Sequence, residues 1–289
     1  DGIFLITDPR QFTWLFSIEN EIRKKTPIAY LNIWDDYPAP MYNKSFYESC
    51  DALLGISKQT VNINKLVLGD KAEDKVIRYI PHGINENVYF PIDENHPEFK
   101  EYSNFKNQVL GGNESSFTLF FNSRNIRRKQ IPDTLLAWKY FLEKVKPENR
   151  DNVNFVLHTE LSSPHGTDLL AVKNYLFGRD YKGIKFSTNK IPTKHLNYLY
   201  NMADAQILLT SNEGWGLSLT EALLTGTPII ANTTGGMQDQ MRFKNEKGEW
   251  IDFDAEFPSN HTGKYKEKGS WAFPVYPTNR SLQGSPQTP

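Results

Sequence analysis

Short apolar segments rich in β-branched residues alternate with segments of helical periodicity along most of the chain. In the first part, the pattern predicts strands over 28–33, 52–56 and 76–80 and a helix over 42–50. Another helix is expected to begin after Ser57, whose hydroxyl is suited to cap it. This alternation is typical of repeated β-α units, and it predicts an α/β fold with parallel sheets.

The second part of the chain repeats the pattern more regularly. Its expected elements, in chain order, are strand 117–122, helix 131–145, strand 153–158, helix 168–177, strand 184–187, helix 193–202, strand 205–209, helix 217–224 and strand 228–231. Ile131, Leu135, Trp138 and Leu142 share one helical face, so we expect them in the core. Beyond Gly236 the pattern is less regular.

A polar stretch with prolines, glycines and little periodicity separates the two series, over about residues 85–116. Such a composition indicates a connection between domains. We therefore expect a first domain over 1–95, a connection over 96–116 and a second domain over 117–289. The chain starts within an apolar segment, 2–6, and it ends without a predicted helix, so a fragment that lacks part of the first domain is expected.

Composition narrows the class of protein. The 289 residues carry a formal net charge of −1, so no overall basic field favours nucleic acid or an anionic membrane as a partner. A single cysteine, Cys50, excludes an intrachain disulfide and favours a reducing compartment. No apolar run approaches the roughly 20 residues that span a bilayer. A cytoplasmic protein without a transmembrane segment is the resulting expectation.

The segment 211–216 combines two glycines with the start of a helix. It follows the carboxyl end of an expected parallel strand, where open α/β sheets bind ligands. Glycines admit a close ligand, and the free N–H groups of the helix start suit phosphate. Glu213 and Glu221 can face the same crevice, where carboxylates accept hydrogen bonds from sugar hydroxyls. The alternative is an ordinary strand-helix turn with two solvated glutamates.

The spacing from Glu213 to Glu221, with Gly-Trp-Gly between them, resembles the donor-binding motif of retaining GT-B glycosyltransferases of family 4. This group is related to sucrose and glycogen synthases. Further segments match the family in the same order, namely 80–85 (Ile-Pro-His-Gly-Ile-Asn), 121–129 (Phe-Asn-Ser-Arg-Asn-Ile-Arg-Arg-Lys), 191–204 and the glycines 235–236. The resemblance implies two Rossmann-like domains whose parallel sheets face a cleft, with the first domain incomplete.

The resemblance also assigns roles to residues of the second domain. Arg124 and Lys129 would contact the donor diphosphate and stabilise the charge that grows on it, without a metal ion. Glu221 would hold the ribose and Glu213 the transferred sugar. The remaining donor-binding positions are Gly214, Trp215, Gly216, Leu217 and, against the base, Ile191.

The first domain of the family supplies a His-Asp pair at a strand end. Here Trp34 stands where the histidine would, while Asp35 occupies the aspartate position and is a candidate catalytic residue. His82 and His158 are more typical of structural groups. Asp252 and Asp254 resemble the metal-binding Asp-x-Asp of GT-A enzymes, although a surface turn is the favoured interpretation.

These features predict a transferase that moves a sugar from a nucleoside-diphosphate sugar to an acceptor, which could be a carbohydrate, a lipid or a protein. As the resemblance implies, the reaction would retain configuration, and it would need neither a cofactor nor a metal. The alternative is a non-catalytic nucleotide-sugar binder or partner subunit, suggested by Trp34 and the short first domain. We find no motif of an epimerase or a phosphorylase.

Overall fold

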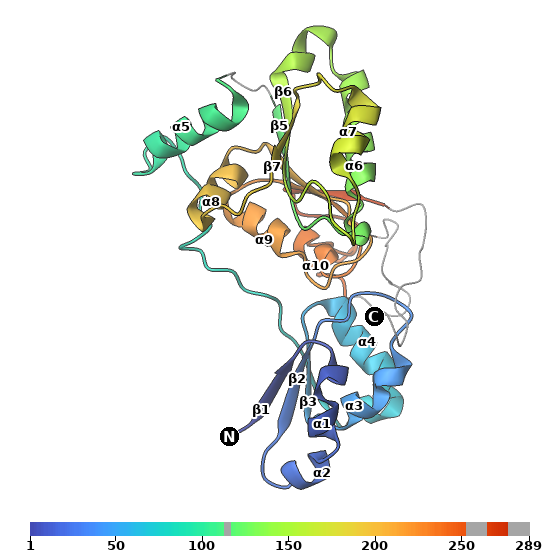
Figure 1. The fold of residues 1–289 in the computed structure, drawn as a ribbon. Coiled ribbons are helices and arrows are strands. Elements are labelled where there is room, and N and C mark those ends of the chain that lie inside the picture. The colour runs from blue at the N-terminus through green and yellow to red at the C-terminus, as the bar shows by residue number, and fades with distance from the viewer. Residues whose placement is uncertain (113–116, 253–264, 277–289) are drawn as a thin grey trace.

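The computed structural model describes residues 1–112, 117–252 and 265–276. Within these ranges the strands form two parallel sheets, one of four strands and one of six (Figure 1). The chain completes the smaller sheet before it enters the larger one. The strands of the smaller sheet, in their spatial order, are β1 (Ile3–Ile6), β2 (Ile28–Asn32), β3 (Ala52–Gly55) and β4 (Val76–Tyr79).

Helices cover one face of the smaller sheet. The main one is α4 (Lys58–Leu68), which begins as predicted at Ser57, whose side chain accepts a hydrogen bond from the Thr60 amide. Leu53, Ile63 and Val67 are buried between this helix and the sheet. Three shorter helices complete the layer, namely α1 (Thr13–Phe16), α2 (Glu19–Ile22) and α3 (Lys44–Glu48).

The larger sheet has the order β10-β9-β8-β5-β6-β7 among the described residues. Its strands are β5 (Phe117–Asn122), β6 (Val153–His158), β7 (Ile184–Ser187), β8 (Ala205–Leu208), β9 (Ile229–Asn232) and β10 (Ala272–Val275). The chain proceeds outward from β5 to β7, returns to β8 on the other side of β5, and continues to β9. The strand order therefore reverses between β5 and β8, and the carboxyl ends of two such strands frame a crevice.

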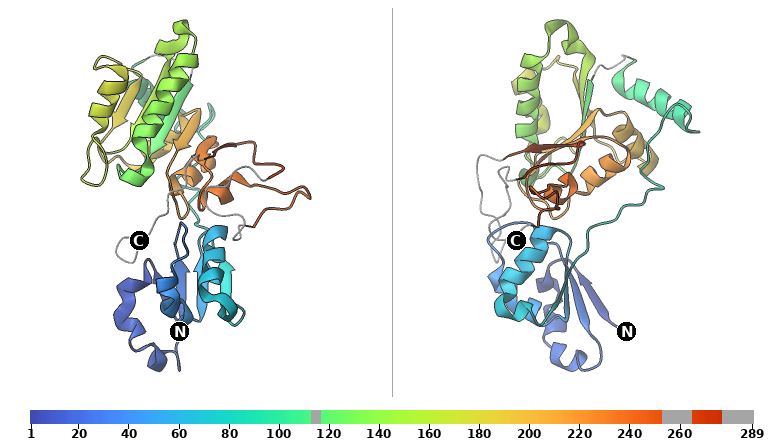
Figure 2. Two further views of the ribbon diagram at one scale, coloured as in Figure 1. Left: turned by 90° about the vertical axis from the view of Figure 1, so that its right-hand side faces the viewer. Right: turned by 180° about the vertical axis from the view of Figure 1, so that it is seen from behind.

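Helices lie on both faces of this sheet, α6 (Ile131–Lys144) and α7 (Leu169–Phe177) on one and α8 (Thr193–Asn201) and α9 (Leu217–Leu224) on the other (Figures 1 and 2). A short helix, α10 (Met237–Met241), follows β9. Because both faces are covered, the strands are largely apolar, as in β5, where Leu119, Phe120 and Phe121 are buried. Among the described residues no helix is long and apolar enough to cross a membrane.

The predicted elements agree with observed ones to within a few residues, but β1, α1, α2, α5, α10 and β10 were not predicted. The longest of these is α5 (Phe99–Leu110). It lies in the stretch that the sequence indicated as a connection with little periodicity. The structure shows why the pattern was weak, since only Tyr102 and Leu110 of this helix are buried. Tyr102 packs edge-on against Tyr198 of α8, with ring centroids 5.7 Å apart. The domain limits at 95 and 116 stay a prediction.

Direct contacts join the two halves of the chain. Trp215 is buried against Leu31 and Ile56, which belong to the first half. The Lys58 amide, at the start of α4, donates to Asp239 Oδ2 of α10 over 3.0 Å. Burial raises the pKa of Asp239 to about 7 against the hydrogen bonds that lower it. These contacts hold the carboxyl ends of the smaller sheet next to the crevice between β5 and β8.

Trp138 gives a test of the core of the second half. It is almost fully buried and packs against Phe155 and Phe141, with ring centroids 5.4 Å and 5.0 Å away. Trp138→Ala removes these contacts and leaves a cavity, so we expect the free energy of unfolding to fall by about 3–5 kcal/mol in urea titrations. Tyr140→Ala, on the exposed side of the same helix, should cost under about 0.5 kcal/mol. Equal losses would contradict the assignment of the core.

Candidate active site

A cavity of about 750 Å³ lies at the point where the strand order reverses. Asn122 and Ser123 line it from the end of β5, and Leu208 lines it from the end of β8. Ile33, Asp35 and Ile56 reach it from the strand ends of the smaller sheet. The cavity is therefore bounded by both halves of the chain, and this volume is typical of a small-molecule site.

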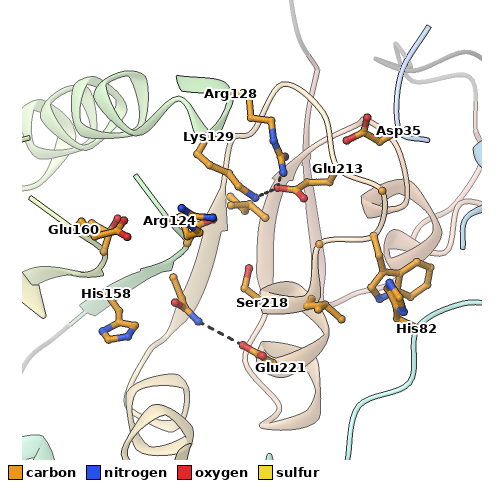
Figure 3. Close-up of a pocket in the computed structure, with 18 of the residues that line it drawn as sticks. Asp35, His82, Arg124, Arg128, Lys129, His158, Glu160, Glu213, Ser218 and Glu221 are labelled. Atoms are coloured by element: carbon orange, nitrogen blue, oxygen red, sulfur yellow. Dashed lines mark hydrogen bonds and ion pairs between the residues drawn. The ribbon is translucent and has the colours of Figure 1, made fainter. Parts of the chain in front are cut away.

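A cluster of buried charges forms one wall of the cavity. Glu213 Oε1 accepts from Lys129 Nζ and forms an ion pair with Arg128 Nη1 at 3.1 Å (Figure 3). Both Glu213 and Lys129 are less than a tenth exposed. Burial lowers the pKa of Lys129, and the carboxylate of Glu213 opposes that shift. Since removal of Glu213 would leave the buried Lys129 ammonium without its ion-pair partner, Glu213 fixes the position of Lys129.

Asn212 connects this cluster to the first half of the chain. Its carbonyl accepts from Arg128 Nη1 over 2.6 Å, and its Nδ2 donates to Asp35 Oδ2 over 2.9 Å. Burial raises the pKa of Asp35, while the nearby charge of Arg128 and the hydrogen bond from Asn212 lower it. Asp35 therefore holds a defined position on the cavity wall.

Arg124 points into the same cavity from the loop after β5 (Figure 3). Its side chain is exposed, and its guanidinium makes no hydrogen bond or ion pair with the residues that the structure describes. The next residue is anchored, because Asn125 Nδ2 donates to the carbonyls of Glu160 and Thr167 over 3.1 Å and 2.7 Å. The backbone beside Arg124 is thus held in place, while its guanidinium is available to a ligand. A guanidinium is well suited to bind phosphate.

Glu221 lines the opposite side of the cavity from the second turn of α9. Its Oε2 accepts from the hydroxyl of Tyr200 and, over 3.4 Å, from Asn122 Nδ2. Burial raises its pKa, and hydrogen bonds from Tyr200, Tyr89 and Asn122 lower it. These donors orient the carboxylate towards the cavity, where it can accept from a ligand hydroxyl.

Helix α9 begins at the cavity, with Gly216 as its N-cap residue at φ +87°. Leu217 and Ser218, in its first turn, line the cavity. The amides of a first helical turn lack intrahelical acceptors and carry a partial positive charge. This helix end therefore adds donors for an anion to the cationic side chains on the other wall.

The turn after β9 packs directly on the segment that carries Glu213. The Gly236 amide donates to the Glu213 carbonyl over 3.0 Å. A Cβ at Gly235 would lie 1.9 Å from that carbonyl oxygen, and a Cβ at Gly236 would lie 2.2 Å from the Gly214 carbonyl oxygen. Both positions therefore require glycine, and Gly235 also has a positive φ of +49°.

Comparison with known proteins identifies the family. Residues 103–256, more than half of the chain, match the family described as glycosyl transferases group 1. The chain belongs to this family. The match spans the loop with Arg124 and Lys129 and the whole segment from Glu213 to Glu221. The resemblance inferred from the motifs is thus confirmed.

Two curated relatives are similar to parts of this group 1 glycosyltransferase. The D-inositol 3-phosphate glycosyltransferase of Geodermatophilus obscurus is 30% identical over 136 residues, which are 46% of this chain and 29% of that protein. The mannosylfructose-phosphate synthase of Agrobacterium fabrum is 23% identical over 197 residues, which are 66% of this chain and 39% of that protein. The chain thus spans well under half of the length of either relative.

Solved structures confirm the predicted GT-B fold class. Sucrose-phosphate synthase from Thermosynechococcus elongatus aligns with a TM-score of 0.59 at 17% identity, covering 83% of this chain and 58% of that chain. HepE of Anabaena, solved in complex with UDP and glucose, aligns with a TM-score of 0.63 at 15% identity, covering 85% and 62%. At these identities the likeness concerns the fold.

The cavity at the strand-order reversal contains most of the residues that the sequence singled out. Those that line it are Asp35, Arg124, Lys129, Glu213, Gly214, Trp215, Gly216, Leu217 and Glu221. Ile191 does not line the cavity and packs instead, half-buried, against the core. Trp215 borders the cavity, but much of its ring is buried against Leu31 and Ile56. The individual roles assigned to these residues stay predictions.

Trp34, at the position expected for a histidine, does not line the cavity. Its Nε1 donates to the Asp36 carbonyl over 2.6 Å, and its ring packs edge-on against Tyr42 at 6.1 Å. Two histidines that the sequence analysis set aside do line it, His82 and His158. Burial lowers the pKa of both, and His158 Nδ1 is hydrogen-bonded to Ser187 Oγ at 2.9 Å. The sequence places His158 at the end of a strand and His82 shortly after one. These positions were the signal that could have marked the two histidines as cavity residues.

The acidic pair late in the sequence lies away from this cavity. Asp252 is 89% exposed at its side chain and pairs with Lys58 Nζ at 2.7 Å. Asp254 lies outside the described residues. In the ranges that the structure describes, no group of three or more His, Cys, Asp or Glu side chains is arranged to hold a metal ion.

The glycine contact behind Glu213 can be tested with a matched pair of variants. Gly235→Ala places a methyl group against the Glu213 carbonyl, whereas Gly226→Ala, also at positive φ, meets open space. We expect Gly226→Ala to lower the free energy of unfolding by about 1 kcal/mol and Gly235→Ala by at least about 2 kcal/mol more, measured by chemical denaturation. Similar effects of the two variants would show that the clash is relieved without cost.

Proposed function

We propose that this chain carries the donor site of a glycosyltransferase that moves a sugar from a nucleoside-diphosphate sugar to an acceptor. The observation that carries the proposal is the cavity at the strand-order reversal. There Arg124, Lys129 and the start of α9 offer positive charge, while Glu221 offers a hydroxyl acceptor on the opposite side. A diphosphate with a sugar at either end needs both kinds of group.

The donor would span the cavity in a definite direction. Its diphosphate would lie between Arg124 and the first turn of α9, and its ribose would donate to Glu221. The base would extend towards the ends of β6 and β7, where His158 and Ser187 lie. The transferred sugar would then face Asp35 and Glu213, next to the first half of the chain.

We infer that the reaction is metal-independent and retains configuration. As the glycosidic bond breaks, negative charge grows on the leaving diphosphate, and fixed cations with a helix N-terminus can stabilise that charge. Retention is supported by the resemblance of the Glu213–Glu221 motif to the retaining family, in which the departing phosphate assists attack from the same face. The names of the two curated relatives include a phosphorylated polyol and a disaccharide phosphate, which favours a carbohydrate-like acceptor here.

A non-catalytic nucleotide-sugar binder is the second candidate. Trp34 does not line the cavity, and Glu213 Oε1 is engaged by Lys129 and Arg128. Both observations reduce the groups available to act on the transferred sugar. The two candidates share the donor site and differ in turnover, so incubation with radiolabelled UDP-, GDP- and ADP-sugars separates them.

Glu221→Ala tests the position of the ribose. Loss of a charged acceptor at a half-buried site costs about 1.5–3 kcal/mol, so we expect the Kd for the best-binding nucleoside diphosphate to rise roughly 10- to 100-fold by calorimetry. Glu246→Ala removes an exposed carboxylate from the same half and should leave the Kd unchanged. An unaltered affinity in Glu221→Ala would contradict the placement of the ribose at Glu221.

The predicted metal independence and the predicted retention of configuration can both be tested in one reaction. With the donor that supports turnover, we expect the rate to be unchanged after treatment with EDTA, because the charge on the diphosphate is met by Arg124, Lys129 and α9. Proton NMR of the first product should show the anomeric configuration of the donor. Abolition of turnover by EDTA, with recovery on adding Mn²⁺ or Mg²⁺, would refute metal independence, and an inverted product would refute retention.

A further inference from the structure

Two cationic side chains share one oxygen of Glu213. Lys129 Nζ donates to Glu213 Oε1, and Arg128 Nη1 lies 3.1 Å from the same atom (Figure 3). The side chain of Glu213 is 9% exposed and that of Lys129 is 11% exposed, whereas that of Arg128 is 35% exposed. Glu213 and Lys129 therefore form a buried pair, with Arg128 as a second and more accessible counter-ion at its edge.

Lys129 has two competing partners under the proposed function. It lines the donor cavity, but in the free chain its ammonium is bound to Glu213. When the ammonium turns to a phosphate, the carboxylate of Glu213 loses that partner. A buried carboxylate without a counter-ion is strongly destabilised. Donor binding would be opposed by this cost unless another cation holds Glu213.

Arg128 is placed to hold Glu213 in this way. Its Nη1 donates to the Asn212 carbonyl over 2.6 Å, which keeps the guanidinium against the segment that carries Glu213. Asn212 is fixed in turn, because its Nδ2 donates to Asp35 Oδ2 over 2.9 Å. A guanidinium offers five N–H donors in a rigid fork, so it can bind the carbonyl and the carboxylate together. The ammonium of Lys129, on a flexible stem, can turn between two acceptors while Arg128 stays.

Direct binding of the diphosphate by Arg128 is the alternative, since this side chain also lines the cavity. Its Nη1, however, already faces two acceptors, the Asn212 carbonyl and the Glu213 carboxylate. The charge of Arg128 also lowers the pKa of Asp35, against the effect of burial. The guanidinium therefore lies on the side of the cavity that we assign to the transferred sugar.

We propose that Arg128 is a positioning residue, which becomes the counter-ion of Glu213 when Lys129 turns to the donor diphosphate. This inference rests on the proposed function, because it needs a diphosphate in the cavity. Lys129 then stabilises the charge on the leaving phosphate, and Glu213 remains an ionised carboxylate that faces the transferred sugar. Arg128 acts on the reaction through Glu213 and does not contact the diphosphate.

The test is a double-mutant cycle on the full chain, measured by calorimetry with UDP, GDP and ADP. For the nucleoside diphosphate that binds most tightly, we expect Arg128→Ala to raise the Kd about tenfold, a coupling that is usual for residues in contact. The reason is that binding then leaves Glu213 without a cation. In the Glu213→Gln background, the same change should alter the Kd less than about twofold, since a neutral amide needs no counter-ion.

A second cycle, in the Lys129→Gln background, covers the case in which Glu213→Gln fails to fold. Without Lys129, Glu213 pairs with Arg128 whether or not a diphosphate is bound, so loss of Arg128 should again change the Kd less than about twofold. If Arg128 bound the phosphates directly, or only supported the loop through the Asn212 carbonyl, Arg128→Ala would weaken binding about equally in every background. Thermal unfolding shows which variants are folded.

Arg127→Ala is the matched control. It removes the same charge from the adjacent residue, which is exposed and does not line the cavity. We expect its Kd to stay within about twofold of that of the unsubstituted chain. The inference is overturned if Arg128→Ala leaves the Kd unchanged, if its effect is the same in the Glu213→Gln or Lys129→Gln background, or if Arg127→Ala weakens binding as much.

The failure of this inference is distinguishable from failure of the proposed function. Additive losses in a chain that binds a nucleoside diphosphate would overturn the role of Arg128 and leave the donor site in place. If none of UDP, GDP and ADP binds the unsubstituted chain, the proposed function fails, and the role of Arg128 fails with it.

Discussion

The buried carboxylate of Glu213 is the interaction on which the site depends. Its side chain holds Lys129 and Arg128, which come from the loop after β5. Its carbonyl accepts from the Gly236 amide, in the turn after β9. Glu213, in the loop after β8, thereby fixes the loops that follow β5 and β9, the strands on either side of β8. A buried charge with two cationic partners is costly to separate, so these three loops form a single rigid frame around the cavity.

The same segment also joins the two halves of the chain. Asn212 donates to Asp35, Gly214 lies against Ile33 and Ile56, and Trp215 is buried beside Leu31. A Cβ at Gly214 would come within 2.7 Å of Ile56, so glycine is what permits this close approach. The geometry of the cavity is thus set by a run of adjacent residues, each with a different neighbour. This explains why the segment from Glu213 to Glu221 is so informative in the sequence.

The sequence predicted those parts of the site that local patterns determine. Arg124 and Glu213 follow strands, and Glu221 lies in the helix that follows Glu213. Parallel strands bring their carboxyl ends to one edge of the sheet, so the convergence of these residues on a cavity could be expected. The orientation of Arg128, Trp34 and Ile191 depends on tertiary contacts that no local pattern reveals. Helix α5 was missed for the same reason, because its stability comes from packing against α8 and little of its surface is buried.

The two cationic side chains that are assigned to the diphosphate differ in their partners and in their burial before a ligand binds. Arg124 has no partner among the described side chains, whereas Lys129 is buried against Glu213. Under the proposed mechanism, a bound diphosphate gives Arg124 a new partner, but Lys129 must share its charge between phosphate and carboxylate. Arg124 and the start of α9 would therefore provide most of the ground-state affinity. Lys129 would respond chiefly as charge grows on the leaving phosphate, which is where a contact accelerates a reaction.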